Sequence, residues 1–188
     1  MPIEVYTPRW HDAVVGLADE VFGAGYFARP SEIAREPGSL ILVSQEKDEV
    51  LLGFVQGQLL PRKALRDHLE RRLLEFPPDI AAADEQGALG VIQAIAVAPE
   101  QRRRGVGTTL LRVLHDRLVG IGADKLVITF KRGPSAAPVD GMMRKLGFEP
   151  WTRLPSYFRE RCDAGDFGCL DRRDGCTCEA LLYRKAVY

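Results

Sequence analysis

One stretch, residues 90–120, constrains the fold of this chain more than any other. It reads GVIQAIAVAPEQRRRGVGTTLLRVLHDRLVG and joins an apolar run to a helix start that carries glycines. The run at 91–97 is uncharged and rich in valine and isoleucine, so it predicts a strand that is covered on both faces. Pro99 ends this strand. From Val106 to Gly120, apolar residues recur every four positions, which predicts an amphipathic helix.

The turn between this strand and this helix has the composition of an anion-binding site. The first turn of a helix carries unpaired backbone N–H groups and the positive end of the helix dipole. Glycines in that turn let an anion approach the backbone, and three consecutive arginines add positive charge. The sequence therefore predicts a phosphate-binding cradle that consists of Arg102, Arg103, Arg104, Gly105, Val106, Gly107 and Thr108.

Two common phosphate-binding patterns do not fit this turn. The chain lacks the P-loop pattern G-x-x-x-x-G-K-[ST], and Leu110 occupies the third glycine position of the dinucleotide fingerprint G-x-G-x-x-G. Instead, R-x-x-G-x-G (Arg102, Gly105, Gly107), preceded by I-A-V-A-P-E and followed by an amphipathic helix, resembles the acyl-CoA signature of the GNAT N-acetyltransferases. A basic helix start with incidental glycines is the alternative interpretation.

The resemblance covers residues 3–148, and residues 145–148 match the K-L-G-F that commonly closes the fourth helix in GNAT chains. It implies an α/β fold with a mixed, largely antiparallel sheet flanked by helices. It also implies an enzyme that transfers the acetyl group of acetyl-CoA to an amine by direct attack on the thioester. In that family, the strand through Ile95, Ala96 and Val97 splays from its neighbour, and the pantetheine arm of the cofactor enters the gap. A backbone N–H there can stabilise the oxyanion.

Two positions depart from the family pattern. Many GNAT enzymes have a glutamate on the cofactor strand and a tyrosine on the fourth helix, where this chain has Gln93 and Met143. Neither side chain can transfer a proton, so neither role carries over. Tyr157 is a replacement candidate for the catalytic acid, and Asp84 and Glu85 are further candidates. For all three, an ordinary surface or packing role is the alternative, with water as the proton relay.

Hydrophobic patterning predicts the remaining elements. Strands are expected at 3–6, 40–44, 50–60, 125–130 and 180–183, and helices at 10–22, 31–36 and from Pro138 to Leu146. By the resemblance, the first two helices border the acceptor pocket. Tyr26 and Phe27 lie between them, where ordinary loop packing is the alternative.

An insert at about 61–86 is longer than the usual GNAT connection. Residues 62–76 predict one helix, ended by Pro77-Pro78, with the apolar stripe Leu65, Leu69, Leu73 and Phe76. This helix either covers the acceptor site or contacts the partner in a homodimer. His68 is interpreted as a surface residue, because no second histidine or cysteine lies nearby at ligand spacing.

The four cysteines of the chain form a second group near its C-terminus. They follow the pattern C-x6-C-x6-C-x-C, and four thiolates complete a tetrahedral zinc site. We therefore predict a structural zinc ion bound by Cys162, Cys169, Cys176 and Cys178. Disulfides or redox chemistry, and thiols without a ligand, are the alternatives.

Length and charge limit the remaining possibilities. At 188 residues we expect a GNAT-like domain at 1–160, with residues 161–188 as a cysteine-rich segment and last strand of the same domain. Zero formal net charge and the absence of a signal or membrane-spanning run favour a cytoplasmic protein without nucleic-acid or membrane partners. The expected partner is a small-molecule or peptide amine. The rival functions are a catalytically inactive acyl-CoA-binding regulatory module and a zinc-stabilised interaction protein.

Overall fold

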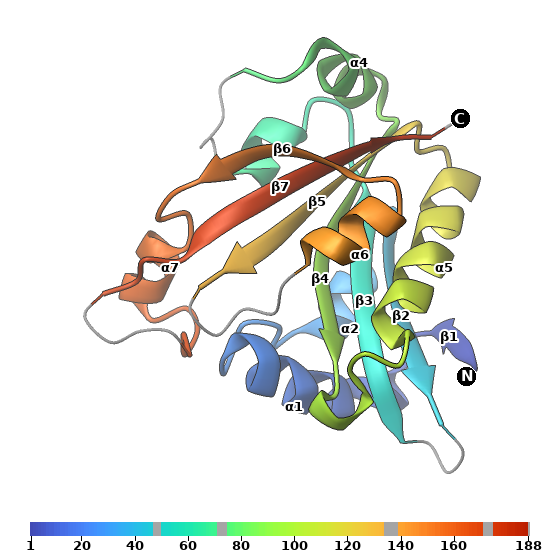
Figure 1. The fold of residues 1–188 in the computed structure, drawn as a ribbon, viewed down its shortest axis with the longest axis vertical. Helices are drawn as coiled ribbons and strands as arrows, with labels where there is room; N and C mark the ends of the chain where they lie inside the picture. The colour runs from blue at the N-terminus through green and yellow to red at the C-terminus, as the bar shows by residue number, and fades with distance from the viewer. Residues whose placement is uncertain (47–49, 71–74, 134–138, 171–174, 188) are drawn as a thin grey trace.

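The computed structural model describes residues 1–46, 50–70, 75–133, 139–170 and 175–187. Over these residues the chain forms a seven-stranded sheet in the order β1-β2-β3-β4-β5-β7-β6 (Figure 1). All neighbouring strands are antiparallel except β4 and β5, which are parallel. The predicted mixed, largely antiparallel α/β fold is confirmed. The strands are β1 (Ile3–Val5), β2 (Ser39–Gln45), β3 (Leu51–Leu59), β4 (Leu89–Val97), β5 (Lys125–Arg132), β6 (Glu149–Leu154) and β7 (Glu179–Ala186).

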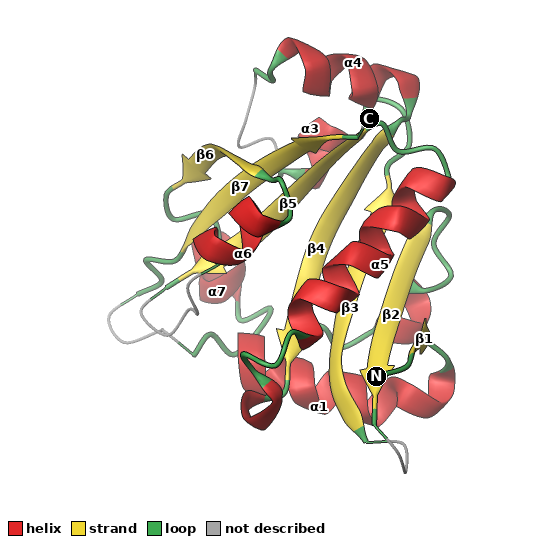
Figure 2. Cartoon of the chain, turned by 45° about the vertical axis from the view of Figure 1, so that its right-hand side comes forward, coloured by secondary structure: helices red, strands yellow, loops and turns green. Residues whose placement is uncertain are grey.

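Helices cover both faces of the sheet. The predicted amphipathic helix, α5, packs against β2, β3 and β4 on one face, and α1 packs against β3 and β4 on the other (Figure 2). In the described residues, no helix has the length and apolarity needed to cross a membrane. The helices are α1 (His11–Phe22), α2 (Pro30–Ile33), α3 (Leu65–His68), α4 (Pro78–Gln86), α5 (Val106–Gly120), α6 (Asp140–Lys145) and α7 (Arg159–Ala164), with 3-10 turns at Pro8–Trp10 and Pro99–Gln101.

The stripe of α5 forms the centre of the core on its face of the sheet. Leu110, Leu114 and Leu118 are all fully buried. The helix can lie close to the sheet because β3 has glycine at position 57. A Cβ atom at Gly57 would lie 2.7 Å from the backbone oxygen of Val91 and 3.0 Å from Cδ2 of Leu114, so a larger residue would push the helix outward.

The parallel strands β4 and β5 separate half-way along β4. Their register ends at the pair Ile92 and Ile128. Beyond that pair, β4 stays paired with β3 as far as Val97, while β5 follows β7 as far as Arg132. The two strands therefore diverge, as Figures 1 and 2 show.

A β-bulge in β4 marks the point of separation. Gly57 of β3 lies opposite Ile92, but the next residue, Gln56, lies opposite Ala94. Gln93 is therefore the extra residue of the bulge. Because a bulge bends its strand and redirects side chains, it accounts for both the divergence of β4 and the position of Gln93 beside it.

The insert differs from its prediction. The sequence predicts one helix over 62–76, whereas the structure has the short α3 and a second helix, α4, that begins at Pro78. The Pro77-Pro78 pair predicts a helix stop, but proline at the first helical position also favours a helix start, because the N–H it lacks has no partner there. Leu65 and Leu69 are buried as predicted. The predicted stripe residue Leu73 and the predicted helix start Pro138 lie outside the described residues.

Candidate active site

The turn before α5 directs several backbone N–H groups outward. Gly105 is the N-cap with φ of 86°, a left-handed conformation that glycine adopts readily. The first backbone bond of the helix runs from Thr109 N to Gly105 O at 2.9 Å. The N–H groups of Val106, Gly107 and Thr108 therefore have no acceptor within the helix and can receive an anion.

The three arginines border this turn. Arg102 Nε donates to the backbone oxygen of Val97 at 3.2 Å, which joins the turn to the end of β4. Arg104 Nη1 donates to Gln101 Oε1 at 2.8 Å. All three arginine side chains are exposed, so their charges reach the solvent around the predicted cradle.

The diverging end of β4 has backbone groups that face away from β3. Ala98 N donates to Leu52 O at 3.0 Å, so this residue faces β3. Because antiparallel strands alternate in the direction of their N–H and C=O groups, Ala96 also faces β3, whereas Ile95 and Val97 face the opposite side. The bond from Arg102 to the oxygen of Val97 agrees with this direction. Where β4 leaves β5, the backbone groups of Ile95 and the N–H of Val97 thus face away from β3, in the direction from which an extended ligand could pair with them.

A cavity of about 260 Å³ lies next to the bulge. Its walls come from the loop between α1 and α2, from the insert, from β3, β4 and β5, and from the segment around α7. Its lining includes Tyr26, Phe27, His68, Gln93, Tyr157 and Arg161.

His68 corrects a prediction from the sequence. It lines the cavity and is half-buried rather than lying on the surface. Gln93 Nε2 lies 3.3 Å from His68 Nδ1, so the bulge residue and the insert meet at this point. Burial lowers the pKa of His68 from 6.5 to about 4, so the imidazole is neutral at physiological pH. No spacing rule signalled this residue, because it comes from an insert and meets a bulge.

The three candidates for the catalytic acid do not lie in the same part of the structure. Tyr157 lines the cavity, is 6% exposed and packs edge-on against Phe158 with ring centroids 5.0 Å apart. Asp84 and Glu85 instead belong to α4 and are not among the residues that line the cavity. Asp84 Oδ1 accepts a hydrogen bond from Leu65 N at 3.0 Å at the start of α3, so its role is structural.

The aromatic residues between α1 and α2 both pack and line the cavity. Phe27 stacks on Phe54 at 5.1 Å. Tyr26 lies edge-on to Phe167 at 5.2 Å, and burial raises the pKa of Tyr26. The two interpretations of this loop, pocket wall and loop packing, are therefore not exclusive.

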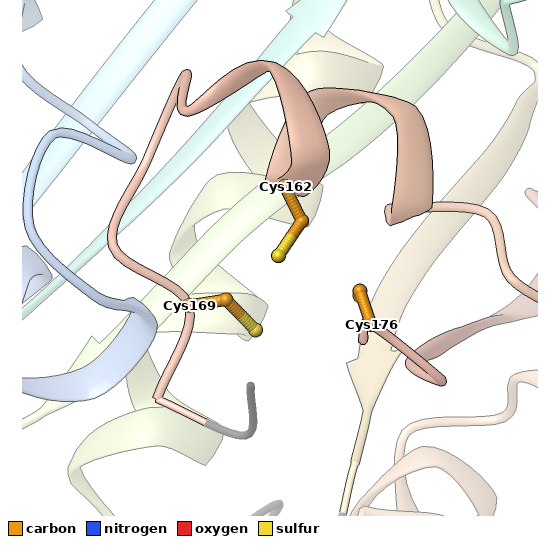
Figure 3. Close-up of side chains that lie close together, drawn as sticks. All are labelled: Cys162, Cys169 and Cys176. Carbon is orange, nitrogen blue, oxygen red and sulfur yellow. The ribbon is translucent and has the colours of Figure 1, made fainter. Parts of the chain in front are cut away.

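The four cysteines gather in one place. The Sγ atoms of Cys162, Cys169 and Cys176 all lie within 4.8 Å of one another (Figure 3). The fourth, Cys178, has its Sγ 4.0 Å from that of Cys169. All four carry thiols. Burial and the neighbouring thiols raise the pKa of Cys162 to about 11, and burial also raises that of Cys178.

Comparisons with known proteins agree with this geometry. The family model described as "Acetyltransferase (GNAT) family" matches residues 6–148. Among curated proteins, no match to the sequence is found.

Similar solved structures come from several organisms. The ribosomal-protein-S18-alanine N-acetyltransferase from Escherichia coli aligns with a TM-score of 0.67 and 16% identity, over 99% of this chain and 93% of that one. The aminoglycoside 6'-N-acetyltransferase from Enterococcus faecium aligns with a TM-score of 0.65 and 12% identity, over 100% and 98%. Chaetomium thermophilum Naa20, solved with a bisubstrate analogue, aligns with a TM-score of 0.63 and 15% identity, over 100% and 87%. At these identities, the structures support the fold alone.

Proposed function

Because the chain belongs to the GNAT family of acetyltransferases, we propose that it transfers the acetyl group of acetyl-CoA to an amine. The observation that carries this proposal is the position of three features around the divergence of β4 and β5. The proposed anion-binding turn precedes α5, backbone groups of Ile95 and Val97 face away from β3, and a partly open cavity lies beside the bulge.

The donor site follows from the first two features. The diphosphate of acetyl-CoA is expected to accept hydrogen bonds from the N–H groups of Val106, Gly107 and Thr108, with the arginines at 102–104 around it. The pantetheine arm is expected to pair with the backbone of Ile95 and Val97, because buried N–H and C=O groups require partners. Its thioester would then reach the bulge.

The chemistry is a direct transfer. The amine nitrogen attacks the thioester carbonyl carbon, and a backbone N–H near Ile95–Val97 stabilises the oxyanion that forms. The C–S bond then breaks, which gives an amide and the thiolate of CoA. The nitrogen must lose one proton and the thiolate must gain one. Tyr157 is proposed to donate the proton to the thiolate, because its side chain lines the cavity.

His68 is proposed to accept the proton from the nitrogen. Its low pKa keeps a neutral imidazole in the cavity, so a ring nitrogen with a lone pair is present throughout the physiological range. As placed, Gln93 Nε2 donates to Nδ1. A half-turn of the Gln93 amide would let its oxygen accept the Nδ1 proton instead, and His68 Nε2 would then carry the lone pair that takes up a proton.

The acceptor is an amine whose identity we test with a panel. Similar structures are named for a ribosomal-protein alanine and for an aminoglycoside 6' position, so the panel includes an N-terminal alanine peptide and an aminoglycoside. Release of CoA is measured with each amine. Turnover with at least one amine, faster than hydrolysis of acetyl-CoA, is expected. Binding of acetyl-CoA without turnover of any amine would contradict enzyme activity.

One observation favours a second function, an acyl-CoA-binding module without catalysis. Gln93 and Met143 occupy the two positions where many family members carry proton-transfer residues, and Met143 is fully buried in the core. Gln93→Glu distinguishes the two functions. In an enzyme, it should raise the rate of CoA release about tenfold, since general base catalysis contributes that much or more. In a regulatory module, acetyl-CoA affinity should be unchanged and turnover should remain absent in both forms.

The proposal assigns the cysteines no part in the transfer. Acyl transfer from a thioester needs no metal, and four thiolates would leave no open position on zinc. We propose a structural zinc ion at this cluster and a cytoplasmic location, where thiols stay reduced. In the third candidate, a zinc-stabilised interaction protein, the cysteine-rich segment docks a partner, and pull-down of partners with and without this segment tests it.

A further inference from the structure

We propose that Cys162, Cys169, Cys176 and Cys178 bind one zinc ion, and that this ion holds together two walls of the cavity beside β4. The metal site stands on the geometry of the thiols alone. Its effect on acceptor binding rests on the proposed acetyl transfer, so the two parts are tested by separate measurements.

The spacing of the sulfur atoms fits a tetrahedral zinc site. Zinc binds thiolate sulfur at about 2.3 Å, which places the ligands of a tetrahedron about 3.8 Å apart. The Sγ atoms of Cys162, Cys169 and Cys176 lie within 4.8 Å of one another, and that of Cys178 is 4.0 Å from Cys169. Cys178 also contacts the thiol of Cys176. For the first three sulfurs, a contraction of at most about 1 Å would reach the tetrahedral spacing, and Cys178, which lies beside Cys169 and Cys176, would supply the fourth thiolate.

The ligands come from three different places in the chain. Cys162 is on α7, Cys169 is on the loop after α7, and Cys176 lies shortly before β7 (Figure 3). Cys178 comes directly before β7. The intervening segment has few large apolar residues, and one of them, Leu170, is exposed. Among its described residues, Phe167 is the one large buried side chain, so a cross-link between the cysteines would add to this limited burial and help offset the entropy of ordering.

Positive side chains surround the cluster. Lys131 Nζ on β5 donates to Cys169 Sγ at 3.4 Å, and Arg159 Nε donates to the backbone oxygen of Cys176 at 3.2 Å. A zinc ion with four thiolates carries two negative charges. Hydrogen bonds and cations around the ligands stabilise such a centre and orient its sulfurs.

The cluster is directly connected to the α7 wall of the cavity. Cys162 follows Arg161 on α7, and Cys162 N bonds to Phe158 O at 2.9 Å. Both Phe158 and Arg161 line the cavity, as does Tyr157 just before them. A fixed sulfur at Cys162 therefore fixes the helical turn that presents these side chains.

The cluster is also connected to a second wall, the loop between α1 and α2. Gly168, next to Cys169, donates its N–H to Ala24 O at 2.7 Å. Phe167 packs against Tyr26, which lines the cavity. The fit is close, because a Cβ at Gly23 would lie 1.9 Å from Gly168 O. The loop that carries Cys169 thus holds the segment between α1 and α2 in place.

The first experiment tests the metal. Untagged protein, purified under reducing conditions, should contain about one zinc per chain, and cobalt substitution should give the absorption of a tetrahedral tetrathiolate site. Cys176→Ser and Cys178→Ser should each lose the zinc. Protein that stays metal-free after zinc is supplied, with four titratable thiols or with disulfides detected by mass, would overturn the site. Full zinc affinity in Cys178→Ser would overturn the four-sulfur set.

The second experiment tests the connection to the walls. Removal of zinc from wild-type protein by a chelator should increase amide hydrogen exchange at 23–27 and in α7, while exchange in α5 stays unchanged. This readout does not depend on activity or on the folding of any variant. With an amine that turns over in the panel, the acceptor KM should rise about tenfold, and acetyl-CoA affinity should change less than twofold. Unchanged exchange at both walls would overturn the positioning role.

Gly23→Ala provides the matched control. This substitution leaves all four thiols in place but forces the loop away from Gly168, and φ of 107° at Gly23 adds backbone strain. The variant should keep one zinc per chain and show increased exchange at 23–27, but α7 should stay protected. Loss of zinc from Gly23→Ala would show that the loop contact, rather than the thiols, builds the site.

Discussion

The two sides of the strand divergence are built differently. On the donor side, β3, β4 and α5 have 9, 9 and 15 residues, and their apolar stripes form one continuous core. On the acceptor side, α3 and α7 have 4 and 6 residues, and the thiol cluster joins α7 to the loop that follows it and to the segment before β7. Short helices contribute little stability by themselves, so the acceptor side depends on specific contacts.

This difference matches what each side must do. The proposed donor is the same molecule in every turnover, and we propose that it binds through backbone N–H groups at the start of α5 and along β4. The acceptor side must present side chains such as His68, Gln93 and Tyr157, which come from an insert, a bulge and a loop. Residues on such segments can change without disturbing the core. Each of the following substitutions changes a residue on one of these two sides.

The largest effect is expected on the donor side, from Gly107→Asp. The new carboxylate would lie in the first turn of α5, where the diphosphate of acetyl-CoA is expected to bind. Acetyl-CoA affinity should fall about a thousandfold, or about 4 kcal/mol, as measured by calorimetry.

Two controls isolate the charge at that position. Gly107→Ala adds a Cβ that would lie 3.4 Å from Val97 Cγ2, so it fits closely and should bind acetyl-CoA almost normally. Gly120→Asp puts the same carboxylate at the exposed far end of α5 and should also bind normally. Unchanged affinity in folded Gly107→Asp would refute the cradle and leave the donor site unassigned.

The next largest effect is expected on the free energy of unfolding, from the protonation of His68 on the acceptor side. Its pKa is about 4 in the folded protein, against an ordinary value of 6.5. Between these values the unfolded chain binds a proton that the folded protein does not. Stability should therefore fall as the pH is lowered from about 6.5 to about 4, by up to about 3 kcal/mol, and His68 should contribute no slope above that range.

Urea unfolding at pH 7.5, 6 and 5 measures this contribution. In His68→Asn the fall in stability between pH 6.5 and 4 should be smaller than in wild type, because the titrating group is gone. The same slope in both proteins would show that His68 is solvated in the folded state. It would then lose its assignment as a neutral group in the cavity.

The donor side could be predicted from the sequence because its signals are local. A four-residue apolar repeat predicts α5, and the helix runs from Val106 to Gly120 as expected. The cradle, which stays a prediction, rests on glycines and arginines within a few residues of that start. The strand at 91–97 was also found, although nothing in its sequence shows that Gln93 is the extra residue of a bulge, since a bulge depends on the partner strand.

The acceptor side could be predicted only in part because its signals are not local. The edge strand β6 contains Pro150, which argues against a strand by composition but is tolerated at the edge of a sheet. The pair of His68 and Gln93 joins residues 25 positions apart. The cysteine pattern did predict a cluster, because four like ligands within a short segment carry information that does not depend on the fold.

A smaller effect is expected from Tyr157→Phe, which removes only a hydroxyl on the acceptor side. If Tyr157 protonates the leaving thiolate, kcat should fall about a hundredfold while acetyl-CoA affinity stays the same. Phe158→Leu is the matched control, because it changes the neighbouring ring of the same wall without removing a proton donor. It should alter the acceptor KM more than kcat. Wild-type kcat in Tyr157→Phe would remove Tyr157 from the mechanism and favour water as the donor.

The smallest effect is expected from Arg104→Ala at the edge of the donor side. Arg104 is exposed and already bonds to Gln101, so its charge is one of several around the cradle and is screened by solvent. Acetyl-CoA affinity should fall only two- to fivefold, or up to about 1 kcal/mol, and the loss should shrink as salt is raised.

Dephospho-CoA, which lacks the 3'-phosphate, gives a second measurement of the Arg104→Ala variant by calorimetry. If Arg104 contacts that phosphate, the substitution should have no effect on dephospho-CoA. An equal loss with both ligands would instead place Arg104 beside the diphosphate, and a loss above a hundredfold would show that side chains, not the backbone of α5, dominate donor binding.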